Sequence, residues 1–365
     1  MPSHQEFMAR AIVLAKRGLF TTDPNPRVGC VLVKNNEILA EGWHEIAGQP
    51  HAERHALAKA GATAKGADCY VTLEPCSHVG RTPPCADALI EAGIRRVVIA
   101  MKDPNPKVAG KGIARLEKAG IDVICGVLSE QAAQLNPGFI QRMEQGRPFV
   151  RSKIAMSLDG RTAMASGESK WITSLDSRRD VQKLRARSSA VLTGIGTILK
   201  DDPLLTVRAE PDWYQSEYVR QPLRVVVDSQ LRFPEQAKMR LDGNPLLIIT
   251  AKTISEQPTT ETVHIANANG QVDLRALMHF LAKREMNEVM VEAGAILNGA
   301  LLQARLVDEL IFYVAAKLMG DNARGAFSVP GMLQMAQNID LDITDMRAIG
   351  SDWRITAKPI YNEAF

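Results

Sequence analysis

Four residues near the N-terminus, His51, Glu53, Cys76 and Cys85, are of types that together bind and use a metal ion. One imidazole and two thiolates are typical zinc ligands, and three protein ligands leave one position of a tetrahedral zinc ion open, as in catalytic sites. Water at that position becomes acidic, and a carboxylate that does not bind the metal can carry its proton to a departing nitrogen. We therefore predict one zinc ion per chain on His51, Cys76 and Cys85, with Glu53 as the catalytic proton carrier.

The spacing of these residues indicates which class of zinc enzyme they belong to. His-Ala-Glu and Pro-Cys match the H-x-E and P-C-x-x-C signature of zinc deaminases, but eight residues rather than two separate Cys76 from Cys85. The long spacer argues against a generic cytidine or tRNA-adenosine deaminase and favours a branch with an inserted loop over 77–84. His51 and His55 are four positions apart, as in the H-E-x-x-H helix of metalloproteases, but the Glu is at the wrong position for that motif.

The segments around these four residues alternate strand-like runs with amphipathic helices, which is typical of an α/β domain. We expect strands over 28–33, 38–42, 70–73, 96–100 and 122–125, and helices over 51–59, 85–91, 112–118 and 129–144. Cys85 then begins a helix, whose dipole would lower the pKa of its thiol. Gly61, Gly93 and Gly120 are expected as left-handed helix ends.

Gly146 and Pro148 stop the last of these helices, so we place a domain boundary there, with one domain over 1–146 and a second over 147–365. The second domain has another α/β pattern. We expect strands over 149–155, 190–193, 223–227, 246–250, 288–291, 308–315 and 353–358, and helices over 175–187, 273–284 and 295–304. The polar stretch 208–220 predicts a surface loop.

Composition argues against two classes of partner. The 44 Lys and Arg residues nearly balance the 41 Asp and Glu residues, so no global charge predicts nucleic acid as a partner. No stretch has the apolar length that a bilayer requires, and the N-terminus lacks the apolar region of a signal peptide. The five cysteines, an odd number, fit reduced thiols and a metal better than a disulfide framework. We expect a cytoplasmic protein that acts on small molecules and interacts with neither nucleic acid nor membrane.

Longer motifs accompany the metal-binding residues and continue into the second domain. They are TDPNPRVGC over 22–30, the His-Ala-Glu box, TLEPCSHVGRTPPC over 72–85, DPNP over 103–106, SLDGRTA over 157–163, GESKWITS over 167–174 and VEAG over 291–294. Together they closely resemble the bifunctional deaminase-reductase family of riboflavin biosynthesis, over nearly the whole chain. The resemblance implies a three-layer, cytidine-deaminase-like α/β domain followed by a dihydrofolate-reductase-like α/β domain.

The resemblance also implies two consecutive activities. The first domain would hydrolyse the 2-amino group of 2,5-diamino-6-(5-phosphoribosylamino)pyrimidin-4(3H)-one to a carbonyl, releasing ammonia, and the second would reduce the ribosyl side chain to ribityl with NADPH. Asn25, His44 and Arg81 would contact the deaminase substrate, with Arg81 in the inserted loop, where a cation can meet a phosphate. We also expect a homo-oligomer, either a dimer or a tetramer.

The second domain has no G-x-G-x-x-G after its first strand, so a standard Rossmann site is not predicted. A glycine-containing turn does follow an apolar strand and enter a helix, whose N-terminal amides can receive a phosphate. The resemblance places NADPH on Ala155, Trp171, Thr197, Asp201, Ser229, Gly294, Ala295, Ile296, Leu297, Asn298, Gly299 and Ala300. It places the reductase substrate on Ser169, Arg185, Leu205, Arg208 and Glu292. Arg185 and Arg208 could hold the phosphate of that substrate bidentately, and Asp201 is a candidate general acid.

One alternative stays open on the residues alone. The first domain could deaminate bases of nucleotides or nucleic acids, with the second domain as a non-catalytic ligand-binding module. The near-neutral net charge and the long spacer between Cys76 and Cys85 argue against nucleic acid as the substrate.

Overall fold

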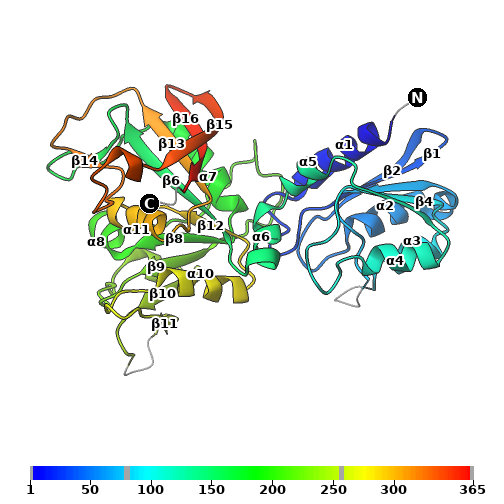
Figure 1. The fold of residues 1–365 in the computed structure, drawn as a ribbon, viewed down its shortest axis with the longest axis horizontal. Coiled ribbons are helices and arrows are strands. Elements are labelled where there is room, and N and C mark those ends of the chain that lie inside the picture. Colours follow the sequence, from blue (N-terminus) through cyan, green and yellow to red (C-terminus); the bar gives the residue numbers. More distant parts are fainter. Residues whose placement is uncertain (1–2, 78–82, 255–258, 362–365) are drawn as a thin grey trace. The chain divides into compact units, whose positions relative to one another are not determined.

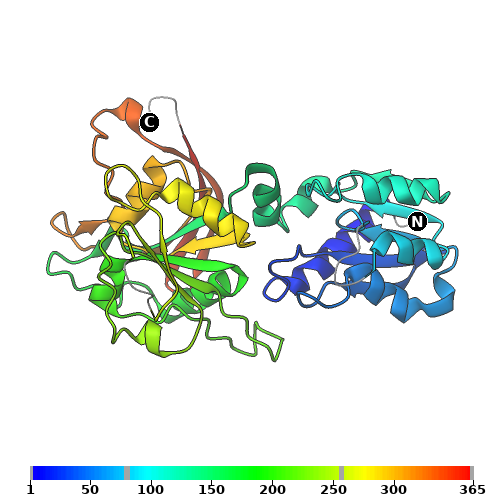
Figure 2. The ribbon, with the colours of Figure 1, turned by 90° about the horizontal axis from the view of Figure 1, so that it is seen from below.

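The computed structural model describes residues 3–77, 83–254 and 259–361. The chain divides into two compact units, Met1–Gly146 and Arg147–Phe365. In Figures 1 and 2 the first unit runs from blue to blue-green and the second from green to red. Each unit has its own sheet and its own hydrophobic core.

The first unit is built on a mixed five-stranded sheet with the strand order β2-β1-β3-β4-β5. The strands are β1 (Gly29–Lys34), β2 (Glu37–Trp43), β3 (Asp68–Val71), β4 (Arg96–Ile99) and β5 (Asp122–Cys125). β1 pairs antiparallel with β2 and β3, whereas β3, β4 and β5 are parallel. All five strands were predicted from the sequence, and their ends shift by no more than two residues.

Helices cover both faces of this sheet. α1 (His4–Ala15) and α5 (Ser129–Ala133) pack on one face, and α2 (Ala52–Ala60), α3 (Cys85–Glu91) and α4 (Lys111–Lys118) pack on the other. Alternate strand residues serve the two layers, since Val31 faces α1 while Cys30 and Leu32 face α2. The unit is therefore the expected three-layer α/β domain. Two short 3-10 turns follow α1 and α2, namely η1 (Lys16–Gly18) and η2 (Gly61–Ala64).

The end of the first unit differs from the prediction. The expected continuous helix over 129–144 is wrong, because α5 ends at Ala133 and α6 (Pro137–Gln145) begins after a break. Pro137 lacks an N–H and restricts the residue before it, so an unkinked helix cannot pass this point. The Asn136 side chain instead accepts from the backbone N–H of Arg27 at 2.8 Å and donates to its carbonyl at 2.9 Å. α6 ends at Gly146, which has a φ of +67°.

The second unit is built on a nine-stranded sheet with the strand order β11-β10-β9-β8-β12-β6-β13-β16-β15. The strands are β6 (Phe149–Ser157), β8 (Ala190–Gly194), β9 (Leu223–Val227), β10 (Leu246–Thr250), β11 (Thr262–His264), β12 (Glu288–Val291), β13 (Glu309–Ala315), β15 (Asp340–Ile349) and β16 (Asp352–Ile360). From β11 to β13 all neighbours are parallel. The last two strands, β16 and β15, are antiparallel.

Helices pack on both faces of this sheet as well. α10 (Leu274–Lys283) and α11 (Ala295–Gln303) cover one face, and α7 (Leu175–Arg187), α8 (Ile195–Asp201) and α9 (Lys238–Leu241) cover the other. A small ribbon of β7 (Arg161–Ala163) and β14 (Arg324–Gly325) lies beside the sheet, and η3 (Met335–Gln337) precedes β15. The carboxyl ends of the parallel strands lie along one edge, where ligands of open α/β sheets bind.

Several elements of the second unit were not predicted. α8 and the short strands β7, β11 and β14 are missing from the prediction because they have no more than seven residues each and show little periodicity. β15 was also missed, although its Leu341, Ile343 and Met346 alternate nearly in the period of a strand. The predicted loop over 208–220 is confirmed, since it holds neither helix nor strand. Of the helices in the described ranges, none combines the length and the apolar character that crossing a membrane requires.

Candidate metal centre and reductase site

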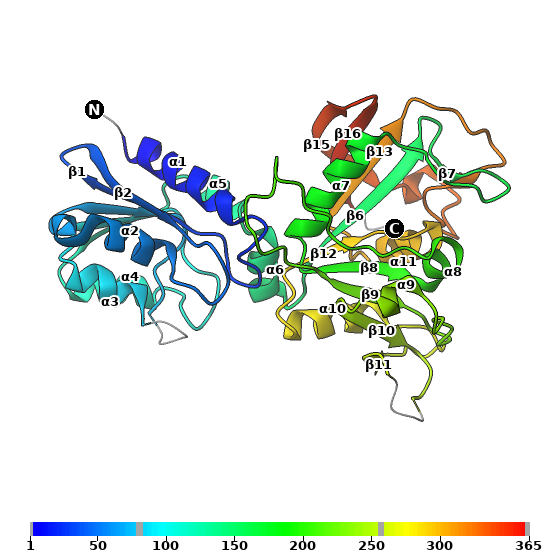
Figure 3. The same ribbon diagram turned by 180° about the vertical axis from the view of Figure 1, so that it is seen from behind.

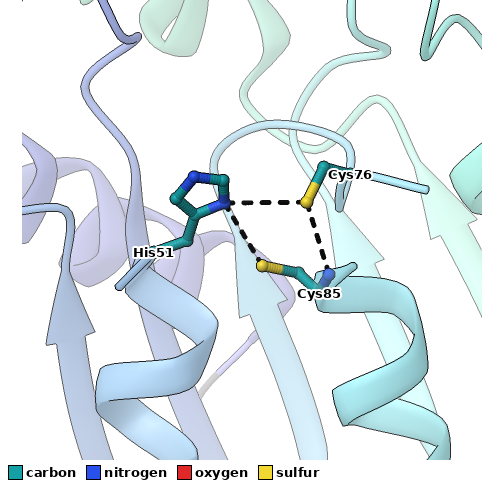
Figure 4. A group of neighbouring side chains, drawn as sticks. All are labelled: His51, Cys76 and Cys85. Carbon is teal, nitrogen blue, oxygen red and sulfur yellow. Dashed lines mark hydrogen bonds between the residues drawn. The ribbon is translucent and has the colours of Figure 1, made fainter. Parts of the chain in front are cut away.

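His51, Cys76 and Cys85 come together at one end of the first unit's sheet. Their three ligand atoms all lie within 4.8 Å of one another. The Nδ1 atom of His51 is 3.6 Å from the Cys76 sulfur and 3.3 Å from the Cys85 sulfur. Figure 4 shows the three side chains pointing toward one another. One nitrogen and two sulfur atoms at such distances fit a zinc ion in the space between them. In the part of the chain that the structure describes, this is the one His, Cys, Asp and Glu group with such geometry.

Three element ends place these side chains. His51, which we expected to be the first residue of this helix, is the N-cap of α2. Cys85 is the first residue of α3, as predicted, and Cys76 follows the end of β3. The backbone N–H of Cys85 donates to the Cys76 sulfur at 3.3 Å. The site is therefore assembled from a strand end and two helix starts.

The two thiols titrate very differently. Hydrogen bonding from Cys85 is the main cause that lowers the pKa of Cys76 to about 4, and His51 contributes in the same direction. The same interaction and burial raise the pKa of Cys85. The lowered thiol pKa that the sequence led us to expect for Cys85 is found on Cys76 instead, because Cys85 and His51 both hydrogen-bond to the Cys76 sulfur. A thiolate at Cys76 is the form that binds a metal.

Glu53 lies beside this cluster and is not a member of it. It is in the first turn of α2, it is buried, and its carboxylate interacts with the Cys85 side chain. Burial raises the pKa of Glu53. A buried carboxyl group with a raised pKa, next to metal ligands, is suited to accept and return a proton.

Two of the three residues predicted to contact the deaminase substrate lie next to the cluster. The His44 ring is 5.3 Å from the His51 ring, and burial lowers the pKa of His44 to about 4, so the ring is neutral. Its Nδ1 can only donate to the Pro50 carbonyl, at 3.1 Å, which leaves Nε2 to accept from the Asn25 amide at 3.1 Å. The structure therefore joins Asn25 to His44. Arg81, the third residue, lies outside the described residues.

Sequence reasoning missed Glu74, two residues before Cys76. Its buried carboxylate accepts from the backbone N–H groups of Asp103, Gly110, Gly112 and Ile113, at 2.9 to 3.3 Å. These bonds tie the start of α4 and the loop before it to the strand end that carries Cys76. A carboxylate with several N–H donors is stable when buried. Only the order Glu-Pro-Cys in the sequence could have pointed to Glu74.

Three charged side chains, each 10–17% exposed, form a mostly enclosed group in the second unit. Glu292 follows the end of β12, and its carboxylate accepts from Nε and Nη2 of Arg185, at 2.5 and 3.0 Å. The third member, Lys153 on β6, was not predicted, and its Nζ is 3.9 Å from Glu292. Burial lowers the pKa of Lys153. Burial alone would raise the pKa of Glu292, but Arg185 outweighs it, and the net pKa is lowered.

The geometry changes what Arg185 can do. Its bidentate edge faces Glu292, and its Nη1 donates to the Thr206 carbonyl at 3.1 Å. The bidentate hold on a phosphate that we expected of Arg185 is therefore already taken by Glu292. Arg208, the other expected phosphate ligand, is exposed, and its charge helps to lower the pKa of Glu292. Leu205, also predicted at this site, is buried near Thr206.

The glycine-containing turn lies at the start of α11. A Cβ on Gly294, the N-cap, would meet no atom within 4 Å, and Ile296 is 81% exposed, so the turn faces open space. Asn298 points inward, since its amide accepts from Ser152 Oγ and donates to the Ala293 carbonyl, each at 2.9 Å. The open helix start fits an anionic group, and Asn298 fixes the shape of the turn from inside.

The other predicted cofactor residues belong to several elements of the second unit. Ala155 is on β6 and pairs with Tyr313 of β13. Thr197 and Asp201 are on α8, and Ser229 follows β9. Ser229 Oγ accepts from the backbone N–H of Val272 at 3.1 Å. Trp171, two residues after the predicted substrate residue Ser169, is 65% exposed, and the guanidinium of Arg178 lies over its ring at 4.3 Å. Ala155, Thr197 and Ser229 lie near the carboxyl ends of β6, β8 and β9, whereas Asp201 is the last residue of α8.

Comparisons with known proteins match both units. Residues 1–101 match the family described as the cytidine and deoxycytidylate deaminase zinc-binding region, and residues 148–355 match the family described as the RibD C-terminal domain. The chain is 53% identical over 354 residues to the riboflavin biosynthesis protein RibD of Escherichia coli strain K12, covering 95% of this chain and 96% of that protein.

Two solved structures are similar over nearly the full length. RibD from Acinetobacter baumannii has a TM-score of 0.91 and 45% identity, with 98% of this chain and 99% of that chain covered. A Thermotoga maritima protein described as a diaminohydroxyphosphoribosylaminopyrimidine deaminase/5-amino-6-(5-phosphoribosylamino)uracil reductase has a TM-score of 0.87 and 35% identity, with the same coverage.

These matches do not favour the alternative of a base deaminase with a non-catalytic second domain, because the second unit itself matches a reductase family. They confirm the deaminase-like and reductase-like domains that the motifs implied. The chain belongs to the RibD family of riboflavin biosynthesis and is a bifunctional deaminase and reductase.

Proposed function

We propose that the first unit (1–146) removes the 2-amino group of 2,5-diamino-6-(5-phosphoribosylamino)pyrimidin-4(3H)-one by hydrolysis, with one zinc ion on His51, Cys76 and Cys85. The observation that carries this proposal is the convergence of the three ligand atoms within 4.8 Å, beside the buried Glu53. Zinc bound there supplies Lewis acidity, which makes water a nucleophile at neutral pH. The bond to the amino nitrogen breaks, a carbonyl forms, and ammonia leaves.

Glu53 carries the proton in this proposal. Its carboxylate takes a proton from the attacking water and returns it to the departing amino nitrogen. The raised pKa that burial gives Glu53 supports both transfers, because the group must hold the proton between them. Asn25 and the neutral His44 line the pyrimidine, and Arg81 meets the phosphate.

We propose that the second unit (147–365) binds NADPH and reduces the ribosyl group of the deaminated product to ribityl. NADPH supplies the hydride for that carbon. NADPH contacts the residues that the family resemblance implies. The start of α11 receives one of its phosphate groups, and the open space at Gly294 supports this fit. Ser169, Leu205, Arg208 and Glu292 bind the substrate, and Arg185 acts by orienting Glu292.

The mostly enclosed pair of Lys153 and Glu292 supplies the proton at the reductase site in this proposal. Reduction of the opened ribosylamine needs one proton in addition to the hydride, and Lys153 is a donor whose pKa is lowered by burial. Glu292 keeps the ammonium in place at 3.9 Å. Asp201, on α8, is the second candidate for this role.

One incubation tests both steps. The full chain, zinc, NADPH and the diaminopyrimidine phosphate are mixed, and ammonia and the absorbance of NADPH are followed together. Ammonia should appear first, and NADPH should be consumed in step with the deaminated product. The deaminated compound, added alone, should consume NADPH without ammonia. Zinc-loaded protein that performs neither reaction would refute the proposal.

We also propose a homo-oligomer in the cytoplasm. β15 is the edge of its sheet, and it exposes Leu341, Ile343 and Met346. An exposed apolar edge strand is a surface that proteins usually cover. None of the five cysteines forms a disulfide, which supports a reducing compartment. Light scattering of the purified chain should give the mass of a dimer or tetramer, and a monomer at micromolar concentration would contradict it.

A further inference from the structure

Two cationic side chains from distant parts of the second unit meet at Gly167. Lys200 comes from the last turn of α8, and Arg324 comes from β14. The Lys200 Nζ and one terminal nitrogen of Arg324 lie 3.6 and 3.4 Å from the position that a Cβ on Gly167 would take. Gly167 has a φ of +93° and is buried, although both cationic residues are exposed. The two charges thus lie over the same stretch of backbone.

Neither cation has an acidic partner within the described ranges of the chain. The ion pairs of the second unit involve other residues, such as Arg185 with Glu292 and Arg147 with Asp308. Two like charges at one place repel each other, and an anion between them removes the repulsion and gains charge-assisted hydrogen bonds. Arg and Lys side by side suit a phosphate group, which has several acceptor oxygens.

The place of this pair in the fold relates it to the reductase site. Lys200 is three residues after Thr197 and therefore lies on the same face of α8. Beyond Arg324 the chain runs to Ser328, whose N–H donates to the Ala295 carbonyl in the first turn of α11, at 3.0 Å. The starts of α8 and α11 adjoin, because a Cβ on Gly194 would meet the Leu297 side chain at 3.5 Å. Figures 1 and 3 show α8, α11 and the β7–β14 ribbon toward the same end of this unit.

We propose that Lys200 and Arg324 bind a phosphate group of a ligand of the reductase unit. The inference rests on the proposed function, since it assumes that this unit binds a phosphorylated ligand. NADPH carries a diphosphate and a 2′-phosphate, and the pyrimidine substrate carries a phosphate ester. Lys200 shares α8 with Thr197 and Asp201, and Arg324 lies four residues before Ser328, which bonds the first turn of α11, so the dinucleotide is the favoured ligand. This site adds cations to a unit in which Arg185 is occupied by Glu292.

The test compares Lys200→Met and Arg324→Met in the full chain with Lys283→Met, an exposed cation on α10, as the matched control. Titration calorimetry gives the dissociation constants of NADPH and NADH, and steady-state kinetics give KM for the deaminated pyrimidine phosphate. Each of the first two variants should weaken binding of its phosphate ligand about tenfold, the loss expected for one hydrogen bond to a charged group. Ammonia release by the first unit should not change. Arg324→Lys should restore part of the affinity, which separates a loss of charge from a loss of fold.

The pattern of losses identifies the phosphate. Weaker NADPH with unchanged NADH assigns the 2′-phosphate, an equal loss for both assigns the diphosphate, and a raised KM alone assigns the substrate phosphate. Values equal to those of Lys283→Met for all three ligands would overturn the inference and leave the proposed function standing. A wild-type chain that neither binds nor oxidises NADPH would refute the proposed function itself.

Discussion

Glu53 and the three side chains beside it have different tasks although they share one site. His51, Cys76 and Cys85 offer atoms within 4.8 Å of one another, and Glu53 stands outside that group. Glu53→Gln keeps the shape and removes the proton carrier. We expect kcat for ammonia release to fall about a hundredfold or more, as for loss of a general acid-base group. Zinc content, measured by atomic absorption, should stay at one ion per chain.

The reductase unit is the internal control for this variant. Consumption of NADPH with the deaminated compound should match the wild type. If Glu53→Gln released ammonia at the wild-type rate, Glu53 would not be the proton carrier. If the variant lost zinc, Glu53 would be a zinc ligand.

A second prediction at the scale of single residues concerns Asp103, which is buried behind Glu74. Burial raises the pKa of Asp103 to about 6, whereas an Asp in an unfolded chain titrates near pH 4. Between these values the folded state binds more protons, so the free energy of unfolding falls as the pH rises from about 4 to 6. Asp103→Asn should therefore stabilise the chain by about 1–3 kcal/mol at pH 7.5 and have little effect near pH 4.

Urea unfolding at the two pH values measures this difference. Asp321→Asn, at an exposed position in the other unit, is the control and should give the same small effect at both. An equal effect of Asp103→Asn at both pH values would show that its carboxyl group is not held in the protonated form.

The residues of the metal centre could be predicted because their chemistry is rare and local. A His-x-Glu and two Cys are informative wherever they occur. Lys153 and Glu74 could not be predicted in the same way, since a single Lys or Glu is usually a surface residue. Lys153 has its role because it lies beside Glu292, and Glu74 has its role because four backbone N–H groups surround its carboxylate. Only the fold brings these groups together.

At the scale of elements, the two glycines of the α11 region, Gly294 and Gly299, differ in the space around them. A Cβ on Gly299 would lie 1.9 Å from the Ser328 carbonyl oxygen, whereas a Cβ on Gly294 would meet nothing within 4 Å. Gly299→Ala should therefore lower the free energy of unfolding by about 1–3 kcal/mol, as overpacking does. Gly294 has a φ of −78°, which alanine adopts without strain, so Gly294→Ala should cost no more than about 1 kcal/mol, because an N-cap prefers glycine to alanine.

The affinity of these two variants for NADPH then tests whether a phosphate group binds at the turn before α11. If a phosphate of NADPH approaches the backbone at Gly294, the added methyl group should weaken NADPH binding about tenfold while the melting temperature changes little. Calorimetric titration measures the first and thermal unfolding the second. Wild-type affinity of Gly294→Ala would place the phosphate elsewhere.

Elements with long, regular patterns were predictable, and short or interrupted ones were not. The parallel strands of the second unit are apolar runs between turn residues, and α7 was predicted with its observed ends, Leu175 and Arg187. The break between α5 and α6 was missed because the helical period continues across Pro137. Tertiary bonds from Asn136 to Arg27 decide that break, and no local pattern contains them.

At the scale of the whole molecule, each side of the boundary is anchored in its own unit. Asn136, shortly before the boundary, bonds Arg27 of the first unit. Arg147, directly after it, forms a bidentate pair with Asp308 of the second unit, at 2.8 and 2.7 Å. The chain can therefore be cut between Gly146 and Arg147 without breaking either anchor. This arrangement predicts two units that unfold separately.

Differential scanning calorimetry of the full chain tests this separation through two ligands. A ligand that binds only the folded form stabilises it, by about 2.7 kcal/mol at a hundred times its dissociation constant. Removal of zinc with a chelator should therefore lower one melting transition, and NADPH should raise the other. A His51→Ala variant should abolish the response to the chelator and keep the response to NADPH. If both treatments instead shift a single transition, the two units unfold as one, and the predicted separation is wrong.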